Sequence, residues 1–501
     1  MSNSLNLIEN IVVVMLENRS FDQMLGTLYP NSSTFEGLKL DGSMYNTFNG
    51  TQYYVTNTSS GDPFTTPTPD PGESFADMNL QIFNTTDPSA SDKANMAGFV
   101  NDYAAGLKGP PPSGIPTGRG CWWLPIDWPT LPRIYPSKPP NKTADPHDIM
   151  FYFTPSQLTV SSALAQSFGV SDAWFGSCPT QTYPNRFFLN CGTSGGYVND
   201  VDYPCHLELL PDLNNIFQLL DGNRGYDPSN WRVYFHDFPI ASLIRYVFMS
   251  HFSEHRMICN FDTSDHGDET KSPTFAEDVK NHTLPKYSFI EPRYDIGKNN
   301  LQPNDSHPPF DVRYGEILVG TIYNLLRASD HYWSRTLLII TYDEHGGCFD
   351  HVIPPSATRP EGTELRGASN FKFDRYGPRV PAILVSPYIR AGSILRPADF
   401  SYIQAEGTST TNGVTPFDHT SVIKTIVECF NIKGGTANLT KRDAGAPSLA
   451  DTLSLGADNM NNGPRNIELP LVDTAPLIGS EGSHLAEIYK AIIKRFGSTT
   501  L

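Results

Sequence analysis

Residues 10–20 read NIVVVMLENRS, and this stretch decides the predicted fold. Ile11, Val12, Val13 and Val14 form a continuous apolar run, which is typical of a strand buried on both faces of a parallel sheet. Glu17 and Asn18 follow at once, although a carboxylate and an amide need water, a hydrogen bond or a metal ion. Ligands of open α/β sheets bind beyond the carboxyl ends of the strands, so the stretch indicates a functional site there.

The remaining apolar runs alternate between strand and helix patterns. Residues 155–175 predict a helix followed by a strand, and strands are also predicted within 284–292, 334–347 and 379–389. Helical spacing is found in 313–329 and 420–430. This alternation predicts an α/β fold with a mostly parallel central sheet, built from right-handed βαβ units and covered by helices on both faces.

Two segments break the pattern and predict surface insertions packed around the site. Residues 30–75 are polar and rich in Thr, Pro and Gly, and residues 105–147 include GPPPSG and PSKPPNK. Without a repeat or a clear linker, we expect a single domain over residues 1–501.

The charge of the chain limits its partners. A formal net charge of −17 argues against nucleic acid and against non-specific adhesion to anionic membranes, because both attract Lys and Arg. The net charge of −17 does not exclude the binding of a single lipid headgroup in a pocket. No run reaches transmembrane length, so no transmembrane anchor is expected. The printed sequence opens without a signal pattern, so a secreted or periplasmic location requires a signal already removed, and otherwise the chain is cytoplasmic or exported differently.

A second predicted strand also ends in acids. TLLIITYDEHGG places Asp343 and Glu344 after a buried run, as Glu17 and Asn18 follow the first strand. Oxygen donors gathered at one edge of a sheet can hold a divalent cation. Either pair alone could instead cap a turn or helix, but the two together favour a metal site.

Further titratable side chains follow these strands and predicted loops. Clustered titratable groups mark functional sites, although each histidine alone is more often structural. The candidates are Asp305, His307 and Asp311 in PNDSHPPFD, His345, Asp350 and His351 in YDEHGGCFDHVIPP, His419 in FDHTSV, and His236 in WRVYFHDFP.

A polar turn offers a nucleophile. SCPTQTYPNRFF, residues 177–188, contains Ser177, Thr180, Thr182 and Asn185 beyond a predicted strand. A hydroxyl held in such a turn can be activated by a metal ion, although this segment alone is more typical of an ordinary polar turn.

Several motifs together carry a family resemblance. ENRSFDQMLG, PNR preceded by a hydroxyl, NDSHPPFD and TYDEHGGCFDHVIPP resemble the phosphoesterase family of non-specific phospholipases C and related acid phosphatases, within the alkaline-phosphatase-like superfamily. MAGFVNDY, LPKYSFIEPRY and FDHTSV extend the likeness in the same order over about residues 8–430, leaving 431–501 as a C-terminal extension.

The resemblance implies a set of site residues and a cofactor. The cofactor is a divalent metal ion, with zinc favoured over calcium or another ion. Thr182 matches the hydroxyl nucleophile, which would form a phospho-threonine intermediate, and His307 matches an active-site histidine near the leaving group. Asn18 and Asn185 are candidate substrate-binding amides. The predicted metal ligands are Glu17, Asn18, Thr182, Asp343 and Glu344.

One position departs from the family pattern. Many members carry DPGH where this chain reads DPGE, so Glu73 stands in place of a catalytic histidine. Glu73 could bind metal, act as an acid or orient a neighbouring histidine, and His236 could supply the missing imidazole.

Three functions are compared. A phospholipase C would cleave phosphatidylcholine-like phosphodiesters, an acid phosphatase would act on small monoesters, and a binding protein would retain only the fold. A phospholipase needs an apolar rim, for which Trp122, Trp123, Trp128 and the stretch 240–252 are candidates, although covering the core is the commoner role of such residues. The phospholipase C reading is favoured.

Overall fold

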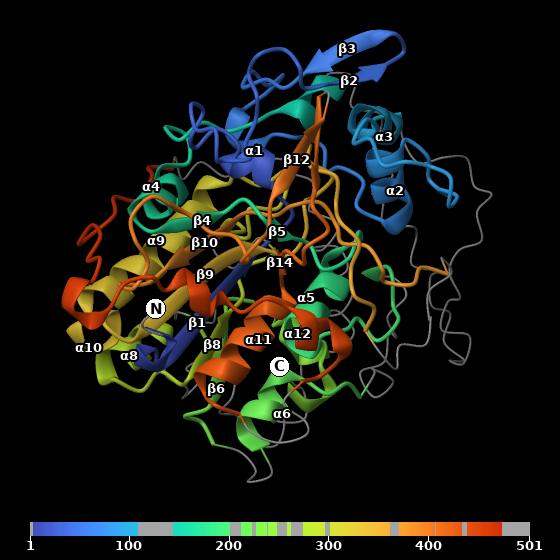
Figure 1. The fold of residues 1–501 in the computed structure, drawn as a ribbon. Helices are drawn as coiled ribbons and strands as arrows, with labels where there is room; N and C mark the ends of the chain where they lie inside the picture. The colour runs from blue at the N-terminus through green and yellow to red at the C-terminus, as the bar shows by residue number, and fades with distance from the viewer. Residues whose placement is uncertain are drawn as a thin grey trace, which may run out of the picture.

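The computed structural model describes residues 4–108, 144–200, 212–222, 227–237, 239–247, 258–261, 274–295, 301–360, 370–405, 407–432 and 438–472. Its centre is an eight-stranded sheet, whose strands cross the middle of the molecule side by side in Figure 1. In spatial order the strands are β11 (Ser393–Ile394), β4 (Gly169–Ser171), β10 (Ala382–Val385), β9 (Thr336–Tyr342), β1 (Asn10–Leu16), β8 (Tyr287–Ile290), β6 (Trp231–Phe235) and β7 (Ile258–Asn260).

The predicted parallel sheet is confirmed with one exception. β1 lies between β8 and β9 and runs parallel to both, and the pairs β6–β8, β6–β7 and β4–β11 are also parallel. β10 pairs antiparallel with both β9 and β4. The apolar run 379–389 does not reveal this reversal, because a strand buried on both faces has the same pattern in either direction.

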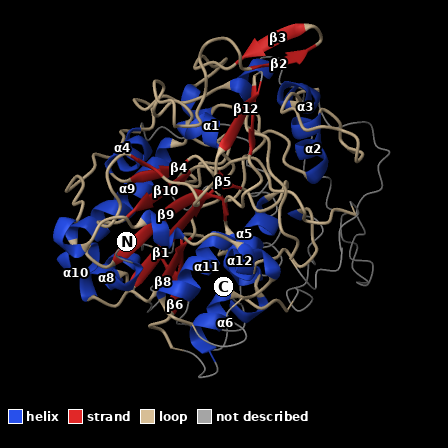
Figure 2. Cartoon of the chain, viewed as in Figure 1, coloured by secondary structure: helices blue, strands red, loops and turns tan. Residues whose placement is uncertain are grey.

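Helices cover both faces of the sheet (Figure 2). α4 (Thr159–Ser167) and α9 (Arg313–Ala328) pack together on one side, with α8 (Phe275–Asn281) and α10 (Asp330–Trp333) beside them in Figure 1. α5 (Thr182–Cys191) contacts α6 (Ile216–Asp221) and α11 (Thr420–Cys429), which in turn contacts α12 (Lys441–Gly445). The two helical layers bury all seven residues of both β1 and β9, as their unbroken apolar runs predict.

The first predicted insertion forms part of a smaller layer at one end of the sheet. Residues 30–75 contain the hairpin β2 (Tyr45–Phe48) and β3 (Thr51–Tyr54), which lies near α2 (Phe75–Phe83) and α3 (Phe99–Gly106) in Figure 1. A second hairpin, β12 (Tyr402–Ala405) and β13 (Thr408–Thr411), lies at the same end, while β5 (Trp174–Phe175) pairs with β14 (Phe417–Asp418). Most of the predicted insertion 105–147 lies outside the described residues.

Within the described ranges, no helix combines the length and the apolar character needed to cross a membrane.

Candidate active site

The ends of β1 and β9 bring the two predicted acidic pairs together. Leu16 is in register with Tyr342, so Glu17 and Asp343 leave neighbouring strands at the same edge of the sheet. The backbone N–H of Asn18 donates to Asp343 Oδ1 at 3.1 Å, and the N–H of Asp343 donates to Leu16 O at 3.1 Å. The structure therefore places Glu17, Asn18, Asp343 and Glu344 in one buried group, which we call the acid centre.

Two unusual backbone conformations allow the two strand ends to approach so closely. Asn18 has a φ of +53°, a left-handed conformation that Asn tolerates better than most residues. Gly346 has a φ of +62°, and a Cβ atom there would lie 2.0 Å from the carbonyl oxygen of Asn18. Only glycine fits at that position, which explains the first glycine of the DEHGG motif.

Ser20 links the two strand ends and starts α1 (Phe21–Leu25). Its hydroxyl oxygen accepts from the N–H of Gln23 at 3.1 Å, which caps the helix, and the hydroxyl donates to Phe349 O at 2.6 Å. The ENRS motif therefore provides the site residues and also the cap that turns the chain away from the sheet.

Thr182 lies at the acid centre, as the sequence predicts. It is the first residue of α5, and its hydroxyl donates to Glu17 Oε2 at 3.1 Å. A hydroxyl donating to a carboxylate is oriented and can transfer its proton. Ser177 and Thr180 have other partners, since Ser177 donates to Asp418 Oδ2 at 2.8 Å and Thr180 donates to the carbonyl of Val198.

Asn185 has backbone partners in the turn that presents Thr182. Its Oδ1 accepts from the N–H of Cys178 at 3.1 Å, and its Nδ2 lies 2.7 Å from Thr180 O and 3.1 Å from Gln181 O. The amide thus fixes the shape of the loop before α5. Its predicted role in substrate binding stays a prediction.

Arg186 is a site residue that sequence reasoning missed. It follows Thr182 by one helical turn, and its Nη2 donates to Glu17 Oε1 at 2.5 Å while its Nε lies 3.6 Å from Asp343 Oδ2. Thr182 and Arg186 thereby engage different oxygens of the same carboxylate. The available signal was the i, i+4 spacing in TYPNR, which places both side chains on one face of a helix.

The side chains of Asn18, Glu73 and His307 form a second group beside the acid centre. Asn18 Nδ2 lies 2.5 Å from Glu73 Oε1 and 2.8 Å from His307 Nε2. His307 Nδ1 lies 2.6 Å from Pro308 O, so this nitrogen donates and Nε2 is the acceptor. Glu73 Oε1 is 3.4 Å from His307 Nε2, and Asp70 Oδ1 is 3.5 Å from Nδ1. The segment that departs from the family pattern thus reaches the site.

Burial and like charge dominate the electrostatics of the acid centre. Burial raises the pKa of Glu17 well above its usual range, and Asp343 raises it further, although Arg186 lowers it. Burial also raises the pKa of Glu344, with Asp343 adding to the effect, and the pKa of Glu73, with Asp70 adding to it. Burial lowers the pKa of His307 to about 4, which keeps its imidazole neutral near pH 7.

Several buried oxygens of the acid centre lack a hydrogen-bond donor among the described residues. These atoms are Asn18 Oδ1, Asp343 Oδ2 and Glu344 Oε1. Buried oxygens normally have partners, and a cation would satisfy carboxylate and amide oxygens together. These carboxylate and amide oxygens therefore fit the ligands of a divalent metal ion, although Arg186 already supplies one positive charge nearby.

Other predicted residues support the site from behind or lie elsewhere. His419 Nε2 is 2.7 Å from Asp343 O, and His345 Nε2 is 2.7 Å from Gln81 Oε1, so both hold the loop after β9. Asp305 O accepts from the N–H of Glu17 at 2.7 Å.

Asp311 binds Arg313 at the start of α9. Asp350 and His351 belong to a separate ion cluster around Arg379.

His236 follows β6, which is separated from β1 by β8. Its ring lies against Phe261 with centroids 4.7 Å apart. A catalytic role for His236 stays a prediction, and the imidazole that lies beside Glu73 is that of His307.

The described part of the candidate apolar rim packs in the core, which is the commoner role expected for such residues. Ile240, Leu243, Ile244 and Val247 are buried in the main core. Trp122, Trp123, Trp128 and residues 248–252 lie outside the described residues.

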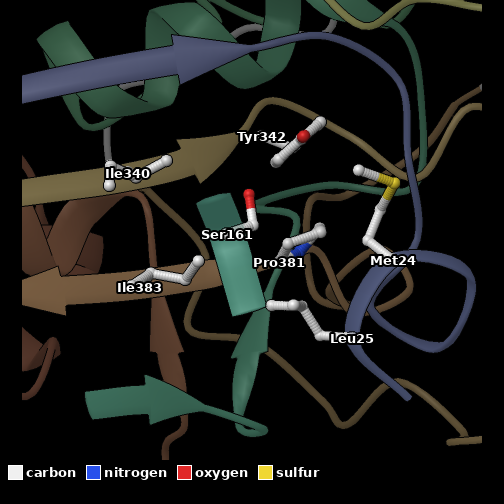
Figure 3. A pocket seen from close by; sticks show the side chains of 7 residues that line it. All are labelled: Met24, Leu25, Ser161, Ile340, Tyr342, Pro381 and Ile383. Carbon is white, nitrogen blue, oxygen red and sulfur yellow. The ribbon is translucent and has the colours of Figure 1, made fainter. Parts of the chain in front are cut away.

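A narrow apolar gap near β9 is part of the core rather than a ligand site. Figure 3 shows Ile340 and Ile383 on one side and Met24 and Leu25 on the other, with Ser161 between them. The gap is too narrow to admit a water molecule. Tyr342 comes just before Asp343, so the apolar side chains around this gap pack against the end of β9.

Comparison with known proteins gives the family. The profile of the Phosphoesterase family matches residues 8–433. The chain belongs to this family. Non-specific phospholipase C1 of Arabidopsis thaliana is 31% identical over 498 residues, covering 97% of this chain and 78% of that protein. Phospholipase C B of Mycobacterium tuberculosis is 26% identical, covering 94% of this chain and 82% of that protein.

A solved structure described as a protein in the alkaline phosphatase superfamily from Vibrio parahaemolyticus is also similar. It has 14% sequence identity and a TM-score of 0.32, with 57% of this chain and 63% of that chain covered. Family membership makes this phosphoesterase a phosphoric ester hydrolase.

Proposed function

We propose that this phosphoesterase is a metal-dependent phospholipase C that cleaves the phosphodiester of phosphatidylcholine-like lipids through a phospho-threonine intermediate on Thr182. The observation that carries the proposal is the contact of the Thr182 hydroxyl with Glu17 Oε2, at 3.1 Å, beside three buried oxygens that have no hydrogen-bond donor in the described part of the chain. The similarity to non-specific phospholipases C supports the choice of a phospholipid diester.

The metal ligands in this proposal are Glu17, Asn18, Asp343 and Glu344, together with the Thr182 hydroxyl. A bound divalent ion would lower the pKa of that hydroxyl and neutralise charge on the phosphoryl group. Zinc is the first ion to test, and calcium the second. Neutralisation is needed because a phosphate ester would otherwise meet several buried carboxylates.

The first chemical step is attack by the Thr182 oxygen on phosphorus. The Oγ–P bond forms, the bond from phosphorus to the diacylglycerol oxygen breaks, and the headgroup phosphate stays on Thr182. Glu17 Oε2 is positioned to accept the hydroxyl proton, and Arg186 favours the ionised form of Glu17 that this role needs. The departing alkoxide needs a proton, which Glu73 can supply, since burial raises the pKa of its carboxyl well above the usual range.

The second step releases the phosphorylated headgroup. A water oxygen attacks phosphorus, the P–Oγ bond breaks, and Thr182 regains its proton. His307 is neutral, and its Nε2, which accepts from Asn18 Nδ2 at 2.8 Å, is the ring nitrogen that can take the proton of the attacking water. Positioning and charge stabilisation account for most of the rate, since phosphoryl transfer needs little covalent help from the protein.

The test compares a soluble choline-phosphodiester chromogen with an aryl phosphate monoester, before and after chelation. We expect metal-dependent diester cleavage that Thr182→Ala abolishes and Thr182→Ser partly retains, because serine keeps a hydroxyl at the same position. Cleavage of the monoester alone would replace the proposal with an acid phosphatase. Turnover of neither substrate with any added metal would favour a binding protein.

A further inference from the structure

The exposed apolar side chains are concentrated on two hairpins. Among the described residues, four of the large hydrophobic side chains that are exposed lie on or beside β2–β3 and β12–β13. We call these four the hairpin patch; they are Leu40, Tyr45, Tyr54 and Ile403. Leu40 is 54% exposed and Ile403 is 53% exposed, which is costly for aliphatic side chains unless a partner covers them.

The two hairpins are neighbours in space. Lys39 Nζ donates to Gln404 Oε1 at 2.5 Å, which joins the segment before β2 to β12. Figure 1 shows both hairpins at the same end of the molecule, with the tip of β12 pointing toward β2. Tyr45 is in register with Tyr54, and their ring centroids are 5.4 Å apart. The tyrosine pair is therefore preformed on paired strands, and Ile403 lies on the neighbouring hairpin.

The β2–β3 hairpin is anchored to the loop that follows the acid centre. Met44 at its base belongs to a small core with Phe99 and Phe349. Phe99 contacts His345 with ring centroids 6.0 Å apart, and His345 directly follows Glu344. The hairpin patch is thus tied to the carboxyl edge of the sheet, where Thr182 lies.

The charge of these segments favours a neutral partner. Residues 38–54 contain only Lys39 and Asp41 as charged side chains, and residues 401–414 contain only Glu406, although the whole chain has a net charge of −17. An anionic surface would be repelled by the chain as a whole, whereas a zwitterionic surface would meet a nearly neutral patch. Tyrosine is suited to that environment, because its ring is apolar and its hydroxyl remains in water.

We propose that the hairpin patch docks this phosphoesterase on zwitterionic phospholipid bilayers. The proposal rests on the phospholipase function proposed above, because it places the enzyme on the surface that contains its substrate. Shallow insertion of two tyrosines and two aliphatic side chains would give reversible binding, as for other interfacial proteins.

The test uses the variant Tyr45→Thr/Tyr54→Thr/Ile403→Thr, since threonine keeps the strand propensity of both hairpins. Leu471→Ser is the matched control, because Leu471 is 93% exposed and lies outside the patch. Co-sedimentation with phosphatidylcholine vesicles and cleavage of phosphatidylcholine in those vesicles are measured beside turnover of the soluble choline-phosphodiester chromogen.

We expect the triple variant to lose about tenfold in vesicle binding and vesicle cleavage, from the apolar area no longer buried, while soluble turnover stays within about twofold. The control should match the wild type in all three assays. Unchanged vesicle binding in the triple variant, or stronger binding of the wild type to phosphatidylglycerol vesicles, would overturn the docking proposal. A wild type that binds vesicles but cleaves no diester would instead contradict the proposed function and leave the docking site supported.

Discussion

Two buried clusters of acids lie near the end of β1, and they differ in how their charges are matched. The acid centre gathers Glu17, Asp343 and Glu344 around Arg186, with several oxygens left without donors among the described residues. The second group, the Arg379 cluster, consists of Arg379, Asp22, Asp350, His351 and Glu36. The acid centre thus has oxygens without a hydrogen-bond donor in the described part of the chain, whereas the acids of the Arg379 cluster are paired with Arg379 and His351.

The Arg379 cluster satisfies its charges internally. Arg379 donates to Asp350 Oδ1 at 3.0 Å and to Asp22 Oδ1 at 2.8 Å. His351 lies between two carboxylates, with Nδ1 2.6 Å from Asp22 and Nε2 3.0 Å from Glu36. Burial acts to lower the pKa of His351, but these carboxylates outweigh it and raise that pKa to about 9.

The difference shows how to separate function from stability in a buried polar group. Carboxylates and a histidine lie within ligand distance of one another in the Arg379 cluster, as Asp22, Asp350 and His351, and beside the acid centre, as Asp70, Glu73 and His307, so composition alone does not distinguish the two regions. Asp22, Asp350 and His351 are already bound by Arg379 and one another, so a metal ion would have to displace them. At the acid centre, Asn18 Oδ1, Asp343 Oδ2 and Glu344 Oε1 have no hydrogen-bond donor among the described residues, which leaves these three oxygens available to a ligand.

The largest expected change is a loss of catalytic activity at the acid centre with little loss of stability. Thr182→Ala should reduce diester turnover by about 1,000-fold or more, since the nucleophile of the covalent step is lost. Its thermal unfolding should change little, because the hydroxyl donates a single hydrogen bond to Glu17. Steady-state kinetics and calorimetry measure both quantities. A fall in turnover of less than about tenfold would exclude Thr182 as the nucleophile.

The next effect concerns stability at the Arg379 cluster. Asp22→Asn should lower the free energy of unfolding by about 3 kcal/mol, because it leaves the buried charges of Arg379 and His351 poorly compensated. Chemical denaturation measures the change, and the exposed Asp41→Asn is the matched control, for which no measurable change is expected. Equal effects of the two substitutions would show that the cluster contributes no stability.

The titration of His351 gives a pH-dependent prediction. Its folded pKa of about 9 lies above the usual value of 6.5, so its contribution is fully present below pH 6.5 and is lost as the pH rises through 9. His351→Gln should therefore lower stability by about 2 kcal/mol at pH 6 and by much less at pH 10. Unfolding curves of both proteins across this range check the prediction. A constant difference between them would contradict a charged His351.

The smallest expected change is a gain in stability when a carboxylate of the acid centre is neutralised. In metal-free protein, Glu344→Gln should raise stability by about 1 kcal/mol, because Glu344 is buried beside Asp343 and its Oε1 lacks a donor among the described residues. Thermal unfolding after chelation measures this change. The same substitution should be destabilising when zinc is present, since a ligand is then lost. Destabilisation under both conditions would argue that Glu344 is structural.

Much of the site was predictable because its residues sit at the ends of strong strand patterns. NIVVVML and TLLIITY predicted two buried strands, and the meeting of Glu17 with Asp343 follows from their adjacency in a parallel sheet. The contact between Thr182 and Glu17 was implied only by family resemblance, because the approach of a polar turn to a strand end depends on tertiary packing.

Other features were not predictable from pattern alone. The reversed direction of β10 leaves no trace in a fully buried strand, and the clamp of Arg186 on Glu17 depends on the position of α5. Glu73 comes from a Pro-rich segment without periodicity, so its contact with Asn18 could not be derived from spacing.

The most direct test of metal binding at the acid centre is equilibrium dialysis of metal-free protein against zinc, with wild type, Glu344→Gln and His351→Gln side by side. We expect wild type and His351→Gln to bind zinc equally, and Glu344→Gln to bind it about 100-fold more weakly because a direct ligand is lost. Binding that is lost in His351→Gln but retained in Glu344→Gln would place the metal in the Arg379 cluster and contradict the account.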